Sequence, residues 1–171
     1  SLGIDRTGHL GTLDPTVTGV LPVMLGKACR LANYLQSDKT YVGIMRLHKD
    51  VNEKELINII KKFIGKITQL PPVRSRVKRA LREREVKSFE ILEISGKDVL
   101  FKTQVQAGTY IRKLCDDIGK NIGGAHMLDL RRINAGIFDE KNSYTLYQLE
   151  QAVDEWKKGD ETSLRNILTP A

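Results

Sequence analysis

Cysteine and histidine are scarce in this 171-residue sequence, and their spacing excludes the common metal and disulfide sites. Cys29 and Cys115 form no Cys-x-x-Cys pair, and the three histidines are scattered without ligand spacing to one another or to the cysteines. The sequence therefore indicates no metal site. Two isolated cysteines, in a chain that shows no signal peptide, favour reduced thiols and a cytoplasmic protein.

Long apolar runs, low-complexity tracts and internal repeats are also missing. Because a membrane-spanning helix needs about 20 consecutive apolar residues, the sequence predicts a soluble protein without a membrane partner. Its 40% hydrophobic and 29% charged residues are ordinary for a chain that buries a substantial core. No linker interrupts the pattern, so we expect one domain over residues 1–171.

Acidic residues are outnumbered, and the surplus of positive charge gathers in one segment. The net charge of +7 favours polyanionic partners, although charge alone is a weak indication of nucleic acid. Basic residues crowd the segment after Pro71-Pro72, where the first acidic residue is Glu83. We predict that this segment binds the phosphates of a nucleic acid. The alternative is a basic strand that only faces solvent. The predicted phosphate-binding residues are Arg74, Arg76, Lys78, Arg79 and Arg82.

Apolar periodicity predicts a mixed order of strands and helices. Strand positions alternate, helical positions recur every three or four residues, and Asn52 and Gly65 bound the clearest helix. The sequence therefore predicts an α+β protein in which strands outnumber strong helices. The expected strands lie at residues 20–25, 41–47, 86–94, 99–105 and 128–133, and the third and fourth of them are expected to form a hairpin. The expected helices lie at residues 28–35, 52–65, 111–122 and 145–156, and the last of these is the expected final helix, which begins with a capping box at residues 145–148.

The most informative stretch is Gly-His-Leu-Gly-Thr-Leu-Asp-Pro at residues 8–15, which places one carboxylate on a restrained turn. Pro15 fixes its own φ and biases Asp14 away from helix, while the glycines allow backbone angles closed to other residues. Most Asp-Pro pairs are simple turns in which the Asp side chain bonds its own backbone. Taken alone, Asp14 would be structural.

The wider context resembles the catalytic motif of pseudouridine synthases of the dyskerin and TruB type. After residues 8–21, three further matches follow in order: residues 39–42 (Lys-Thr-Tyr-Val), 108–114 (Gly-Thr-Tyr-Ile-Arg-Lys-Leu) and 124–132. Residues 70–79 are more similar to the archaeal and eukaryotic dyskerin branch than to the bacterial one. Four ordered motifs make a chance match improbable.

The resemblance implies a role for five side chains. Asp14 would be the nucleophile and Arg112, in the first turn of a helix, its ion-pair partner, because a carboxylate that loses hydration needs a cation to stay ionised. Tyr41 would stack on the flipped base and relay the C5 proton, Leu130 would wall the pocket and exclude water, and His9 would stack beside the extruded nucleotide. On spacing alone, Tyr41 and Leu130 are core residues and His9 is structural.

The resemblance also implies a fold and partners. The fold would be the pseudouridine synthase fold, a mixed and mainly antiparallel sheet flanked by helices, without the family's N-terminal element or its PUA domain. The reaction needs no cofactor. The substrate would be rRNA or tRNA, with a box H/ACA guide RNA and small accessory proteins as partners. A guide-independent enzyme for the tRNA T-loop and a non-catalytic RNA-binding scaffold are the alternatives.

Overall fold

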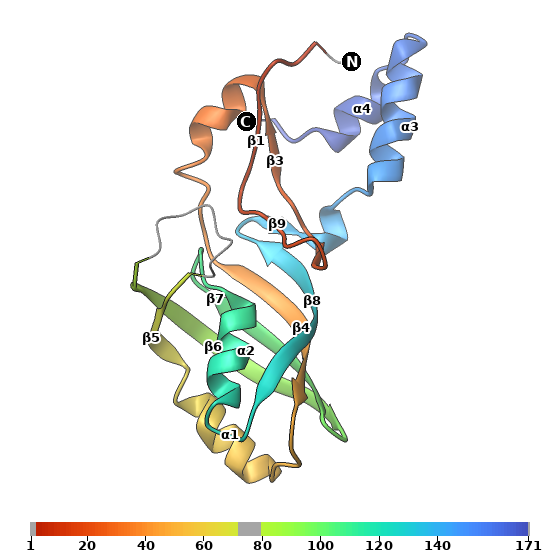
Figure 1. Ribbon diagram of the computed structural model, residues 1–171. Helices are drawn as coiled ribbons and strands as arrows, with labels where there is room; N and C mark the ends of the chain where they lie inside the picture. The colour runs from red at the N-terminus through yellow and green to blue at the C-terminus, as the bar shows by residue number, and fades with distance from the viewer. Residues whose placement is uncertain (1–2, 72–79, 171) are drawn as a thin grey trace.

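The centre of the protein is a seven-stranded sheet, described together with its surroundings by a computed structural model over residues 3–71 and 80–170 (Figure 1). The strands are β1 (Thr7–His9), β2 (Thr18–Gly19), β3 (Val23–Leu25), β4 (Lys39–Leu47), β5 (Gly65–Gln69), β6 (Arg82–Ser95), β7 (Asp98–Val105), β8 (Ala125–Ala135) and β9 (Phe138–Asp139). The helices are α1 (Glu53–Lys61), α2 (Ile111–Gly119), α3 (Leu146–Lys157) and α4 (Thr162–Ile167), with 3-10 turns η1 (Gly26–Leu31) and η2 (Glu140–Asn142).

The sheet is mixed but mainly antiparallel, as expected for the α+β class. Its strand order is β2-β8-β4-β7-β6-β5, with β9 paired to β8, and only the short β2 runs parallel to its neighbour. The β6–β7 pair closes at a turn where Gly96 has a positive φ, which confirms the predicted hairpin. Strands β1 and β3 pair with each other in a separate ribbon.

The core lies between the sheet and helices α1 and α2. Leu56, Ile59 and Ile60 bury the apolar face of α1, and Asn52 accepts a hydrogen bond from the Lys54 N–H as the N-cap. Helix α2 lies across the sheet (Figure 1) and contributes the fully buried residues Leu114, Cys115 and Ile118. Ile111, the first residue of α2, belongs to the same core cluster as buried residues of β4, β6 and β7, so the start of α2 is packed into the core.

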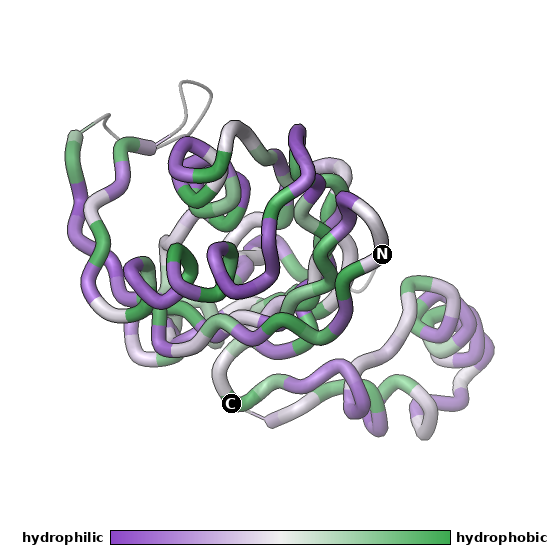
Figure 2. Tube along the Cα trace, turned by 90° about the horizontal axis from the view of Figure 1, so that it is seen from below, coloured by the Kyte–Doolittle hydropathy of each residue, from purple (hydrophilic) through white to green (hydrophobic). Residues whose placement is uncertain are grey.

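Helices α3 and α4 lie apart from the sheet in both views (Figures 1 and 2). The predicted capping box is present, because Thr145 and Gln148 exchange hydrogen bonds across the first turn of α3. The Tyr144 hydroxyl donates to the Asn166 carbonyl oxygen at 3.1 Å and ties the two helices together. The sequence prediction of α3 as the final helix is wrong, since α4 follows it.

Three predicted elements differ from the structure in kind or in the way they end. Residues 20–25 are not one strand: Val20 donates its N–H to the Arg132 carbonyl oxygen of β8, Val23–Leu25 pair with β1, and Pro22 between them has no N–H to donate. Of residues 28–35, only residues 28–31 are helical, and they belong to the tighter 3-10 turn η1 rather than to an α-helix. Helix α1 ends at Lys61, and Gly65, with φ +102°, opens β5 instead of capping the helix.

Candidate active site

Asp14 lies on a β-turn between β1 and β2, within the segment that leads on to β3. The Val17 N–H donates to the Asp14 carbonyl oxygen at 2.9 Å, with Pro15 at the second turn position that its fixed φ suits. Leu10 donates to the Pro22 carbonyl oxygen at 3.1 Å and closes the base of the loop. The carboxylate therefore projects from a backbone that is held at both ends.

A buried arginine of β8 holds this loop from below. Arg132 is 1% exposed, and its guanidinium donates to the Val20 carbonyl oxygen at 2.7 Å and to the Gly11 carbonyl oxygen at 3.0 Å. Gly19, with φ +104°, passes so close to the Arg132 backbone that a Cβ there would lie 2.0 Å from its carbonyl oxygen. One strand thus fixes the two ends of the segment that carries Asp14.

Asp14 and Arg112 form a direct ion pair across 98 positions of sequence. The Arg112 Nη2 donates to Asp14 Oδ2 at 2.6 Å, from the second residue of α2. The two side chains are 49% and 52% exposed, so the pair is open to solvent. The expectation that Leu130 keeps water from this pair does not hold in the structure.

Tyr41 lies on β4 directly opposite Arg132 of β8 and is 8% exposed. Burial raises the pKa of the Tyr41 hydroxyl, against the charge and the hydrogen bond of Arg132, which lower it; the negative charge of Asp14 raises it further. The phenol is therefore neutral at neutral pH, and both the Arg132 guanidinium and the Asp14 carboxylate lie within electrostatic range of it.

Lys39 is a second buried cation beneath the loop. It is 8% exposed at the start of β4, and burial first, then the charge of Arg132, lowers its pKa, while Asp38 raises it. Its ammonium group packs against Gly11, where a Cβ would lie 3.1 Å from Nζ. The underside of the loop is therefore strongly cationic.

Sequence reasoning missed the roles of Lys39 and Arg132, although both lie inside matched motifs. One signal was available for Lys39: it shares the alternating phase of Tyr41, Met45 and Leu47, which are all buried along β4. A charged residue in the buried phase of a strand needs polar partners, and such partners gather at functional sites. The same argument applied to β8 would have singled out Arg132.

The other candidate residues of the pocket lie at the margins. Leu130 is 5% exposed and belongs to the hydrophobic core, in register with Gly43, which has no side chain to obstruct it. His9 is exposed at the end of β1, opposite Val23. The structure places Leu130 beside the Tyr41–Arg132 pair on β4 and β8, and leaves His9 on the outer ribbon.

Of the predicted phosphate-binding residues, only Arg82 lies in the described part of the chain. It opens β6, half-buried and in register with Gln69 at the end of β5. The remaining four predicted residues lie outside the described residues, and these are Arg74, Arg76, Lys78 and Arg79.

Within residues 3–71 and 80–170, no three His, Cys, Asp or Glu side chains cluster as metal ligands would. Both cysteines are free, and burial raises the pKa of the Cys115 thiol well above its usual value. Over the same residues, every helix is too short or too polar to cross a membrane.

Family models account for the whole chain. The N-terminal domain model of TruB family pseudouridylate synthases matches residues 1–56 and 48–111, and the C-terminal domain model of tRNA pseudouridylate synthase B matches residues 112–171. The chain belongs to the TruB family of pseudouridylate synthases, which confirms the resemblance identified from its four motifs.

Archaeal relatives are similar over nearly all of the chain. The probable tRNA pseudouridine synthase B of Methanopyrus kandleri is 50% identical over 171 residues, which cover 98% of this chain and 51% of that protein. The protein of the same description from Archaeoglobus fulgidus is 49% identical over 172 residues, covering 99% and 53%. The chain thus spans about half the length of these curated relatives.

Solved structures share the fold. A crystal structure of a Cbf5-Nop10-Gar1 complex matches with a TM-score of 0.90 at 48% identity, covering 99% of this chain and 53% of the matched chain. A structure of an H/ACA RNP bound to a substrate RNA containing 2'-deoxyuridine matches with a TM-score of 0.86 at 44% identity, covering 99% and 51%. The predicted pseudouridine synthase fold is therefore confirmed.

Proposed function

We propose that this chain carries the catalytic centre of an RNA pseudouridine synthase, with Asp14 as the nucleophile. The observation that carries the proposal is the Asp14–Arg112 contact of 2.6 Å, which joins two separate family motifs at an open surface. A scaffold that only binds RNA has no use for a carboxylate that faces phosphates, because it would repel them. The ion pair therefore favours catalysis over a binding role.

The reaction breaks the bond between ribose C1' and uracil N1 and forms a new bond between C1' and C5 of the same base. N1 gains a proton and C5 loses one, so nothing is added overall and no cofactor is needed. Asp14 can assist by adding to C6 of the base, or by acting on the ribose to give a glycal. In either route Arg112 holds the carboxylate in place and balances its charge.

Tyr41 supplies an aromatic surface for the flipped base. Because its pKa is raised, the hydroxyl is neutral and can exchange a proton with C5 only as a relay. Leu130 and His9 complete the proposed pocket, as a core wall and an outer stacking surface.

The proposed context is an H/ACA guide ribonucleoprotein that acts on rRNA or tRNA. The support is the likeness to Cbf5 in complexes with Nop10 and Gar1 and to an H/ACA RNP with bound substrate RNA. A second candidate is guide-independent modification of tRNA, favoured by the description of the archaeal relatives as probable tRNA pseudouridine synthase B. The two free cysteines support a cytoplasmic location.

The nucleophile is tested by Asp14→Asn, which keeps the shape of the side chain and removes its charge. Tritium release from C5-labelled uridine should be abolished, while RNA binding stays equal or becomes slightly tighter. Asp50→Asn is the matched control. Lys39, at the start of β4, lies against the loop that carries Asp14, whereas Asp50 is exposed beyond the end of the same strand, about 30 Å from Lys39. Near wild-type tritium release by Asp14→Asn would exclude Asp14 as the nucleophile.

The guide requirement is tested with the same assay. The protein is incubated with tRNA and with an rRNA fragment, each with and without a box H/ACA guide and proteins of the Nop10 and Gar1 type. Modification only with the guide supports the ribonucleoprotein. Efficient modification of tRNA by the protein alone supports the second candidate, and RNA binding without modification in every mixture supports the scaffold.

A further inference from the structure

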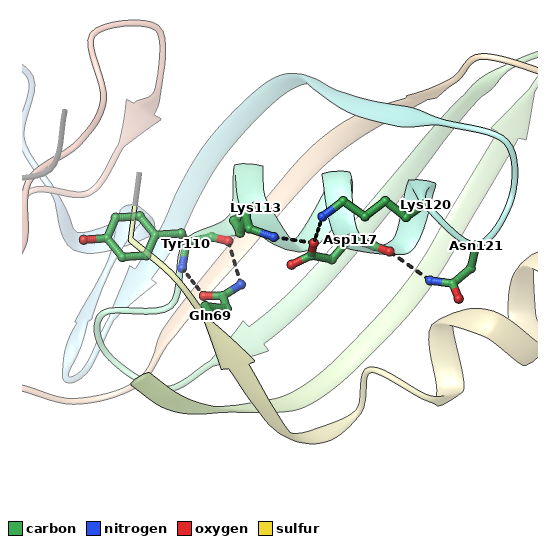
Figure 3. A network of polar contacts seen from close by, with 6 residues as sticks. All are labelled: Gln69, Tyr110, Lys113, Asp117, Lys120 and Asn121. Carbon is green, nitrogen blue, oxygen red and sulfur yellow. Dashed lines mark hydrogen bonds and ion pairs between the residues drawn. The ribbon is translucent and has the colours of Figure 1, made fainter. Parts of the chain in front are cut away.

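A buried glutamine clamps the residue from which helix α2 starts. Gln69, the last residue of β5, is 2% exposed. Its Nε2 donates to the Tyr110 carbonyl oxygen at 3.1 Å, and its Oε1 accepts from the Tyr110 N–H at 3.0 Å (Figure 3). One side-chain amide thus satisfies both main-chain groups of a residue 41 positions away.

This arrangement is specific to an amide. A buried side chain at the end of a strand is usually apolar, and a buried polar one must find partners for its donor and its acceptor. Among side chains that do not ionise, only the amide of Asn or Gln offers a donor and an acceptor side by side, in the spacing of a peptide group. Gln69 therefore bonds to Tyr110 as the backbone of a neighbouring strand would.

Tyr110 is the N-cap of α2 and has no side-chain cap of its own. Its carbonyl oxygen also accepts the Leu114 N–H at 3.0 Å, so the Gln69 amide and the first helical turn meet at one atom. Two residues after Tyr110 comes Arg112, whose guanidinium reaches Asp14. A displacement of Tyr110 would therefore be passed through one helical turn to the ion pair.

The segment just before Tyr110 is restrained by different means. Gly108 has φ +82° and packs against the guanidinium of Arg84 on β6, and the Thr109 hydroxyl donates to the Gln106 carbonyl oxygen at 2.8 Å. Toward the other end of α2, Asp117 accepts from Lys113 and Lys120 along the helix surface (Figure 3). These contacts support the loop and the helix, but only Gln69 holds both peptide groups of the N-cap residue.

We infer that Gln69 is a positioning residue for the proposed reaction: it sets the start of α2 so that Arg112 meets Asp14. This inference rests on the proposed function for its kinetic consequence, and on the geometry for its structural one. A misplacement of about 1 Å at a reacting centre can cost about 100-fold in rate. The clamp is therefore expected to act on the chemical step through Arg112, without contact with RNA.

The first test is Gln69→Leu, with Gln104→Leu as the control because Gln104 is exposed on β7 of the same sheet. Single-turnover tritium release, measured well below the unfolding temperature of each variant, should fall about 10-fold to 100-fold in Gln69→Leu only. The dissociation constant for RNA should not change in either variant. A wild-type rate in Gln69→Leu would overturn the inference while the proposed function stands.

A double-variant cycle separates positioning from general support of the fold. If Gln69 acts through Arg112, the rate of Gln69→Leu/Arg112→Met should equal that of Arg112→Met alone. If Gln69 only supports the fold, the two losses should multiply, and that result would refute the positioning role.

In the variant Gln69→Glu, protonation of the new carboxyl group should restore the two hydrogen bonds to Tyr110. A protonated carboxyl group can donate to the Tyr110 carbonyl oxygen and accept from its N–H, whereas an ionised one cannot donate. The rate of this variant relative to wild type should therefore rise as the pH falls, and a ratio that does not depend on pH would count against the clamp.

A crystal structure of Gln69→Leu provides a readout that does not depend on activity. The 2.6 Å contact between Arg112 and Asp14 should be broken or lengthened. If the wild type proves inactive with every RNA and guide, the proposed function fails, and this structure still decides the inference. An unchanged contact would overturn it.

Discussion

The buried arginine of β8 makes the sharpest prediction, because its neighbour in the sequence is a natural control. Arg132→Met keeps an unbranched side chain as far as the position of Nε but removes the guanidinium that donates to Val20 and Gly11. Arg131→Met removes a guanidinium that is 54% exposed and paired with Glu140 at 2.8 Å. The two variants differ in burial and not in the kind of side-chain change.

The expected cost follows from the two acceptors. Val20 is buried, so its carbonyl oxygen is left without a partner, which costs about 1–3 kcal/mol. Gly11 is exposed, so water replaces the lost bond at a cost of about 0.5–1.5 kcal/mol. Relief of the repulsion between Arg132 and Lys39 offsets part of this loss. We therefore expect a net loss of roughly 1–3 kcal/mol in the free energy of unfolding.

Urea and thermal unfolding measure this loss directly. For a chain of this size, the loss corresponds to a fall in Tm of roughly 3–10 °C. Arg131→Met should cost less than about 1 kcal/mol, as exposed ion pairs do. Tritium release should fall about 100-fold in Arg132→Met, because the loop that carries Asp14 loses the hydrogen bonds that hold it. Equal unfolding midpoints and equal rates for the two variants would refute the argument that Arg132 holds the loop.

Three further perturbations test separate parts of the site. Arg112→Met should lower the single-turnover rate about 100-fold while urea unfolding changes by less than about 1 kcal/mol, because its pair with Asp14 is half exposed. Lys39→Met should raise Tm at neutral pH, since folding lowers the pKa of Lys39 and disfavours its charge; this gain should shrink as the pH rises through the folded pKa toward 10.5. Replacing Arg76, Lys78 and Arg79 with Ser should flatten the slope of log affinity for RNA against log salt by about two units; an unchanged slope would exclude the segment as the phosphate grip.

Local patterns predicted the elements whose stability is local. The apolar stripe of α1, the hairpin of β6 and β7 and the capping box at Thr145 each depend on residues near one another in sequence. Where the outcome depended on distant partners, the patterns gave the wrong extent. Residues 20–25 read as one strand, yet Val20 donates its N–H to the Arg132 carbonyl oxygen of β8, and β3 pairs with β1 instead.

The candidate site divides in the same way. Asp14 and Arg112 came from motif resemblance, and the structure brings these two side chains into contact. Gln69, Lys39 and Arg132 were missed, because the role of each side chain depends on which backbone groups and charges the fold brings next to it. The alternation of positions along a strand can indicate that a polar residue is buried. It does not indicate which group in the fold will be the hydrogen-bond or charge partner of that residue.

The buried side chains that hold the candidate site in place, Arg132 and Gln69, are polar because the site itself is open to solvent. Under the proposed function, the catalytic centre receives a folded polyanion and needs an exposed nucleophile, and Asp14 is half exposed on a loop that leaves the sheet. An exposed loop has little apolar surface to anchor it, so hydrogen bonds to its main chain must do so instead. Arg132 supplies such bonds to the Asp14 loop, and Gln69 supplies them to the start of the helix that bears Arg112. Burying Arg132 beside Lys39 costs folding energy, and that cost is consistent with a frame selected to hold a reactive geometry rather than to maximise stability.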